Sequence, residues 1–274
     1  MQTLSSIAVA DPLSIVARGL ALSYILVSLE YVTLRRYFTI VSPLSWNLSP
    51  YALERPKFIA GFAAFSWLGG SSVYLSLCIA RVLVSAVLLI YGLNIMFAPV
   101  VVSFLLSVLA LEFLRQPRVL EGSDHMLLVV NTSLLLPAFL PGSSAAYTVA
   151  VCFIAVQLAM SYFFAGLAKL ASAHWRTGDA LTCVMRANVY GQSWLALPMH
   201  KHRLFALVMS WTVILWELFF PLLIWIDALM PFMLGFGVAF HVANATVLGL
   251  NRFVVIFVSC YPVIVHLTEM KLRT

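Results

Sequence analysis

Residues 146–169 read AYTVAVCFIAVQLAMSYFFAGLAK, and this run decides the fold class. It holds no charged side chain before Lys169, and it is longer than the roughly 20 residues that cross a bilayer as a helix. A helix satisfies its backbone hydrogen bonds internally, which is what a segment surrounded by lipid requires. We therefore expect residues 146–169 to form a membrane-spanning helix.

The rest of the chain has the same character. Of its 274 residues, 63% are hydrophobic and only 9% are charged, against about 45–50% and about 25% in soluble domains. This composition excludes a disordered, collagen-like, coiled-coil or disulfide-rich secreted protein. It predicts an all-α polytopic transmembrane helical bundle with about eight spans, forming a single domain over residues 1–274. The expected spans are 13–34, 75–94, 96–114, 126–140, 146–169, 204–225, 229–249 and 253–268.

The positive charges indicate orientation in the membrane. The formal net charge is +6, but the basic residues are scattered at the ends of apolar runs, so we expect no nucleic-acid partner. With eight crossings, twelve basic residues, Arg81 among them, fall on or near the side opposite the N-terminus, and two fall on the N-terminal side. The positive-inside rule then places the connections 35–74 and 170–203 in the cytoplasm. No basic segment precedes the first span, so we expect that span to be retained.

Ionisable residues inside the spans are the candidates for function, because charges within a bilayer are rare and expensive. At about 1.5 Å of rise per residue, Arg18 and Glu217 lie at similar depth near the N-terminal side, and we expect them to form an ion pair. The four cysteines include no CxxC pair. We therefore expect neither a metal site nor a disulfide framework.

A second polar group is expected near the opposite side. By the same depth arithmetic, His125, Lys169 and His241 lie on three helices at comparable levels. Gly166 and Gly237 each share a helix face with one of these residues and would let a neighbour approach closely. The three side chains therefore form one candidate cavity. The structural alternative, in which the lysine reaches the interface and each histidine bonds across helices, stays open.

Five segments, in order along the chain, resemble one family. They are 122–128 (GSDHMLL), 162–170 (YFFAGLAKL), 175–181 (WRTGDAL), 215–221 (LWELFFP) and 240–253, in which Phe240-His241-x-x-Asn244 precedes Gly249-x-x-x-Phe253. Together they resemble the core signature of the vitamin K-dependent gamma-carboxylase-like membrane proteins, also called the HTTM domain family. The resemblance covers nearly the whole chain.

The resemblance implies roles for particular residues. Lys169 matches the lysine that deprotonates vitamin K hydroquinone in the carboxylases, and a desolvated neutral amine is chemically suited to act as a general base. His125 and His241 match two histidines of the family site and complete the expected catalytic set. Asp124 stands where the family has asparagine, which changes the charge of the site. The positions expected to contact a bound cofactor are Asn244, Tyr162, Asp124 and Trp216.

The function expected from these observations is that of an integral membrane protein, in a bacterial plasma membrane, that binds a quinone, a hydroquinone such as vitamin K, or a lipid. Lys169 would act as base in redox or proton-abstraction chemistry. The carboxylases carry a large soluble region after their spans, so peptide carboxylation is not expected of this chain. The alternative is a non-enzymatic membrane factor for the maturation or export of a small secreted peptide, of the sporulation-delaying type. A transporter or a haem protein is less favoured.

Overall fold

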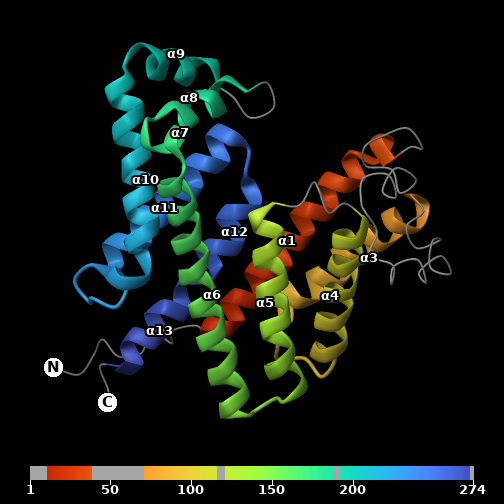
Figure 1. The fold of residues 1–274 in the computed structure, drawn as a ribbon. Coiled ribbons are helices and arrows are strands. Elements are labelled where there is room, and N and C mark those ends of the chain that lie inside the picture. Colours follow the sequence, from red (N-terminus) through yellow and green to blue (C-terminus); the bar gives the residue numbers. More distant parts are fainter. Residues whose placement is uncertain (1–10, 39–70, 116–120, 188–191, 272–274) are drawn as a thin grey trace, which may run out of the picture. The chain divides into compact units, whose positions relative to one another are not determined.

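The computed structural model describes residues 11–38, 71–115, 121–187 and 192–271, and every regular element in these ranges is a helix (Figure 1). The predicted all-α class is thus confirmed. The chain divides into two compact units, Met1–Ala150 and Val151–Thr274, with the boundary inside one long helix. The prediction of a single domain over the whole chain stays a prediction.

The first unit is built around its N-terminal helix. Its elements are α1 (Pro12–Thr33), the 3-10 turn η1 (Arg35–Phe38), α3 (Ser71–Tyr91), α4 (Ala98–Arg115) and α5 (Gly122–Phe139). Helix α1 begins where the Asp11 carboxylate accepts a hydrogen bond from the Ser14 backbone N–H at 3.1 Å, with Pro12 in the first turn. It packs against α3 and α5, and α4 packs against the same two helices. Helices α3 and α4, consecutive in the chain, pack against each other as a helical hairpin.

The second unit contains the longest helix and a group of short ones. Its elements are α6 (Ser144–Ala171), α7 (Ala173–Arg176), α8 (Asp179–Arg186), α9 (Ser193–Lys201), α10 (Arg203–Leu223), α11 (Met230–Leu248), α12 (Asn251–Ser259) and α13 (Tyr261–Lys271). The short helices α7, α8 and α9 pack against the beginning of α10, and α11 packs against α10 and α12 (Figure 1). The described parts of the predicted connection 170–203, residues 170–187 and 192–203, are therefore mostly helical.

All eight predicted spans fall on helices. Within the described ranges, six stretches are long and apolar enough to cross a membrane: Pro12–Thr33, Ser72–Tyr91, Ser144–Ala171, Arg203–Leu223, Met230–Leu248 and Asn251–Met270. A shorter apolar helix covers Ala98–Leu114. The last predicted span is interrupted, because α12 ends at Ser259 and α13 begins at Tyr261. The number of spans is therefore approximate, but the polytopic character is clear.

One detail of the predicted topology changes. Arg81 was expected to flank a span, but it lies in the middle of α3 and is fully buried. It therefore adds nothing to the charge at the membrane surface, and the positive-inside count loses one of its twelve residues. Most of the predicted connection 35–74, residues 39–70, lies outside the described residues. The sidedness stays a prediction.

Candidate functional site

A cavity of about 310 Å³ lies within the second unit. Its walls come from α6, α7, α8, α10, α11 and α12 together with the short loop after α11, and they are mainly aliphatic and aromatic. A few polar side chains interrupt this lining: Ser161, Tyr162, Lys169, Glu217, His241 and Asn244. An apolar cavity with a small number of converging polar groups is the usual form of a small-molecule site.

Lys169 and Glu217 form an ion pair in the cavity wall. The Lys169 Nζ lies 2.8 Å from Oε1 and 2.6 Å from Oε2 of Glu217, so it donates to both carboxylate oxygens. The lysine side chain is 19% exposed and the glutamate side chain 4%. The Lys169 ammonium also lies 5.2 Å from the centre of the Trp175 ring, within reach of a cation–π contact. The pair is thus internally neutralised, and its lysine borders open space.

Gly166 explains how the two helices bring this pair together. A Cβ atom at this position would lie 2.7 Å from the Leu218 backbone nitrogen and 3.0 Å from the Glu217 Cβ. The backbones of α6 and α10 therefore approach too closely for any other side chain at this crossing. Lys169 lies three residues further along α6, and its long side chain reaches back to the level of Glu217.

A hydrogen-bond chain occupies another part of the cavity wall. The Tyr162 hydroxyl lies 2.6 Å from His241 Nε2 and 2.8 Å from the Tyr261 hydroxyl. All three residues are buried. Gly237, one turn before His241, makes room for this arrangement, because a Cβ atom there would collide with the Tyr261 hydroxyl oxygen. Trp216 packs edge-on against Tyr162, with ring centroids 4.8 Å apart.

The short helices after α6 form a further wall. Trp175, Leu181, Val184 and Met185 line the cavity from α7 and α8. This wall is fixed to α10, because Ser210 Oγ donates to the Trp175 carbonyl at 2.5 Å. The turn between α7 and α8 uses Gly178 with a φ of +80°, and a Cβ atom there would lie 2.8 Å from the Leu207 backbone nitrogen. The segment 173–186 therefore forms one wall of the cavity and is held in place by α10.

The region that holds the cavity matches a known protein family. The family model of the HTTM domain matches residues 142–268, and this range includes every residue that lines the cavity. The chain is a membrane protein that carries an HTTM domain. A search of curated proteins and a search of solved structures each returned no match.

The structure brings together four of the residues predicted from sequence. Lys169, His241, Tyr162 and Asn244 all line the cavity of the HTTM domain. Trp216 lies directly behind Tyr162, and its indole N–H donates to the Met233 carbonyl at 3.2 Å. The catalytic and binding roles expected for these residues stay predictions.

The other two predicted site residues belong to the first unit. Asp124 is buried, and its Oδ2 accepts from the Glu121 backbone N–H at 2.8 Å, so it forms a capping box at the start of α5. His125 is exposed, and its Nδ1 lies 2.9 Å from the Glu121 carbonyl oxygen. Its ring also packs edge-on against Phe113 at 5.3 Å. These contacts give both residues a local role at a helix end.

The predicted ion pair between Arg18 and Glu217 is wrong. Arg18 donates to the Leu89 carbonyl at 3.2 Å and to Ser14 Oγ at 2.8 Å, whereas both oxygens of Glu217 bind Lys169. The depth arithmetic failed because the first turns of α10 pack against α7, α8 and α9. Residue 217 therefore lies level with Gly166, near the end of α6, and not at the opposite end of the span.

Sequence reasoning missed Tyr261 and the pairing of Lys169 with Glu217. A tyrosine inside an apolar run carries no functional signal by itself, because aromatic residues are common in any core. The pairing had a recoverable signal, because each residue is the acidic or basic member of a motif quoted for the family resemblance. No group of three or more potential metal ligands occurs among the described residues.

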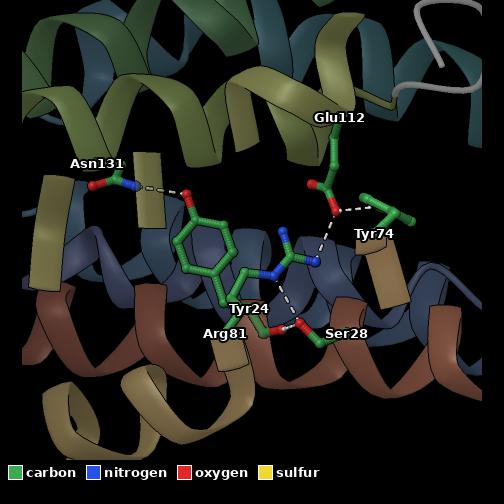
Figure 2. Close-up of polar contacts among 6 residues, drawn as sticks. All are labelled: Tyr24, Ser28, Tyr74, Arg81, Glu112 and Asn131. Atoms are coloured by element: carbon green, nitrogen blue, oxygen red, sulfur yellow. Dashed lines mark hydrogen bonds and ion pairs between the residues drawn. The ribbon is translucent and has the colours of Figure 1, made fainter. Parts of the chain in front are cut away.

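A separate polar cluster is buried in the first unit (Figure 2). The Arg81 guanidinium lies between α1 and α4, with Nη2 2.7 Å from Glu112 Oε1 and Nε donating to Ser28 Oγ at 2.7 Å. The Tyr74 hydroxyl donates to the same Glu112 oxygen at 2.8 Å. The guanidinium also lies 5.2 Å from the centre of the Tyr24 ring, and the Tyr24 hydroxyl bonds the Asn131 side chain at 2.7 Å. This cluster joins α1, α3, α4 and α5.

Proposed function

We propose that the HTTM domain of this chain binds an uncharged, lipid-soluble ring molecule of the quinone or quinol class, and that Lys169 acts as base toward a hydroxyl of that ring. The protein would do so in a bacterial plasma membrane. The observation that carries the proposal is the internally neutralised pair of Lys169 and Glu217 in the wall of a mainly apolar, aromatic-lined cavity.

The charge balance of the cavity supports an uncharged ligand. Lys169 is matched by Glu217, so a ligand with a net charge would find no free counter-ion there. Burying an unmatched charge in such surroundings costs several kcal/mol. Tyr162, Phe240 and Phe253 line the same cavity, and aromatic side chains favour flat ring ligands through offset or edge contacts.

The different levels of the two polar groups along α6 support a ligand with an oxygen at each end. Two positions on α6 give these levels: Tyr162, whose hydroxyl contacts His241 Nε2, and Gly166, which packs against Glu217. These two positions are four residues apart, which corresponds to about 6 Å along a helix. A six-membered ring with oxygens on opposite carbons is of this length. One oxygen would then face the Lys169 and Glu217 pair, and the other would face His241.

The proposed proton step balances within the ion pair. The ring hydroxyl passes its proton to the Lys169 nitrogen while Lys169 passes one of its own protons to a Glu217 oxygen. The O–H bond of the ligand breaks, an O–H bond forms on Glu217, and Lys169 remains an ammonium beside the new ligand anion. The anion is thus stabilised by the same charge that previously neutralised Glu217.

Mass spectrometry of molecules that copurify with the protein tests the binding. We expect the wild type to carry a ring-bearing lipid in near-stoichiometric amount. Ala165→Phe places a ring into the cavity between Tyr162 and Lys169 and should abolish this occupancy. Leu167→Phe is the matched control, because Leu167 lies on the same helix with 41% exposure and does not line the cavity. Equal occupancy in the wild type and Ala165→Phe, or no ring molecule at all, would contradict the proposal.

The base role is tested with Lys169→Arg. Arginine can keep the ion pair with Glu217 but does not lose its proton in proteins, so it cannot relay. We expect the variant to bind naphthoquinol without forming the bound quinolate, which the wild type should form and which absorbs at longer wavelength. The matched control Lys201→Arg, at an exposed position at the end of α9, should behave as wild type. Equal quinolate in Lys169→Arg and wild type would exclude Lys169 as the base.

A further inference from the structure

His241 has one ring nitrogen in a hydrogen bond and one without a partner. Its Nε2 contacts the Tyr162 hydroxyl, whereas its Nδ1 is buried and makes no hydrogen bond with any part of the chain that the structure describes. The residue as a whole is 2% exposed and lines the cavity. A buried, unmatched polar atom is unfavourable in a native fold, so this atom indicates a contact that the polypeptide itself does not supply.

The hydrogen-bond chain can run in two directions. In the first, Tyr261 donates to the Tyr162 oxygen, Tyr162 donates to His241 Nε2, and the histidine proton sits on Nδ1. In the second, His241 Nε2–H donates to Tyr162, and Tyr162 donates to Tyr261. A neutral imidazole has one donor and one acceptor nitrogen, so the direction fixes which kind of group Nδ1 is.

The first direction leaves fewer groups unmatched. It gives both tyrosine hydroxyl protons an acceptor and leaves only the Nδ1–H without one. The second direction leaves the Tyr261 hydroxyl proton without an acceptor among the described residues, and it leaves the Nδ1 lone pair unmatched as well. Since unsatisfied buried polar groups are costly, the first direction is the more stable one.

We propose that Tyr261 and Tyr162 hold His241 as its Nδ1–H tautomer, so that this wall of the cavity presents a hydrogen-bond donor. The class of ligand follows and rests on the proposed function: an uncharged ring whose end at His241 carries an acceptor oxygen, which is a hydroxyl oxygen in a quinol and a carbonyl oxygen in a quinone. Tyr261 is then a positioning residue, because it acts on the ligand only through Tyr162 and His241.

The packing around the hydrogen-bonded side chains of Tyr261, Tyr162 and His241 keeps them in place. The Phe257 ring lies 5.0 Å from the His241 ring and 5.6 Å from the Tyr162 ring, measured between centroids. Gly237 leaves the space that the Tyr261 hydroxyl fills. These contacts fix the ring plane of His241 before any ligand binds, which lowers the entropy lost on binding.

Nitrogen-15 NMR of histidine-labelled protein in lipid bilayers measures the tautomer directly and requires no ligand. We expect the His241 signals, identified by their loss in His241→Gln, to show a protonated Nδ1 and an unprotonated Nε2. Tyr162→Phe should shift both signals strongly, Tyr261→Phe should shift Nε2 by less, and the control Tyr147→Phe, in the first unit, should shift neither. A protonated Nε2 in the wild type would overturn the proposal, as would unchanged signals in Tyr162→Phe. An unmoved Nε2 in Tyr261→Phe would overturn the positioning role of Tyr261.

Titration of the same sample with naphthoquinone and with naphthalene tests the ligand class. Naphthoquinone has acceptor oxygens and naphthalene has none, although both carry the same fused rings. We expect the His241 Nδ1 signal to move with naphthoquinone alone. If naphthoquinone binds and Nδ1 stays unmoved, the donor role is wrong. If neither compound binds, the proposed function fails while the tautomer measurement still decides the hydrogen-bond direction.

Discussion

Two ion pairs, one in each unit, each join a basic side chain to a glutamate but have different surroundings. Arg81 and Glu112 have side-chain exposures of 0% and 2%, whereas Lys169 and Glu217 have exposures of 19% and 4%. The guanidinium of Arg81 is held by Ser28 and Glu112 and faces the Tyr24 ring (Figure 2). Lys169 borders a cavity. The comparison indicates that a closed pair fixes helices to one another and that an open pair is available to a ligand.

The closed pair should give the largest effect on stability. Arg81→Met leaves the Glu112 carboxylate buried without its cation, and breaking a buried pair from one side costs about 3–5 kcal/mol. The double variant Arg81→Met/Glu112→Met removes both charges and should recover most of this loss. Unfolding in detergent, followed by circular dichroism, measures the free energies. A double variant as unstable as the sum of the two single variants would show that the residues do not interact.

Gly237→Ala, in the cavity wall beside His241, should have a smaller effect than Arg81→Met, comparable to that of breaking the open pair. The added methyl group collides with the Tyr261 hydroxyl, and overpacking of this kind costs about 1–3 kcal/mol. Gly235→Ala is a matched control on the same helix, because a Cβ atom there has no neighbour within 4 Å. Thermal unfolding of both variants checks the difference. Equal loss of stability in the two would mean that only helix propensity had changed.

Glu217→Gln should destabilise the second unit by less than Arg81→Met destabilises the first. The loss is about 1.5–3 kcal/mol, the usual contribution of a hydrogen bond to a charged group. It is limited because Lys169 remains 19% exposed and can turn toward the cavity. The same detergent unfolding assay measures it. A loss as large as that of Arg81→Met would indicate that the second pair is closed as well.

Breaking the exposed pair of Arg203 and Asp179 should give the smallest loss of stability among the ion pairs compared. Their closest atoms are 3.5 Å apart, and the side chains are 78% and 47% exposed. Exposed ion pairs contribute about 0–1 kcal/mol, so Arg203→Met should leave the unfolding free energy nearly unchanged. A loss above that range would mean that Arg203 has a packing role at the start of α10.

The helices could be predicted from sequence because apolar runs of sufficient length have one stable form in a membrane. All eight predicted segments are helical, and the cavity holds Lys169, His241, Tyr162 and Asn244 as a group. The ion pairs were harder to predict from the sequence. Arg81 and Glu112 lie 31 positions apart, and Lys169 and Glu217 lie 48 apart. Which charges meet depends on where each helix begins and on close crossings such as the one at Gly166, which residue spacing alone does not encode.

Binding of naphthoquinone to the protein in lipid nanodiscs, followed by quenching of tryptophan fluorescence, tests the difference between the two clusters most directly. We predict that His241→Leu and Glu217→Gln each weaken binding about tenfold or more, which corresponds to about 1.4 kcal/mol. The first-unit double variant Arg81→Met/Glu112→Met should bind as the wild type does. Equal affinity in all four proteins, or a loss of binding confined to the first-unit variant, would contradict the assignment of the ligand site to the HTTM domain cavity.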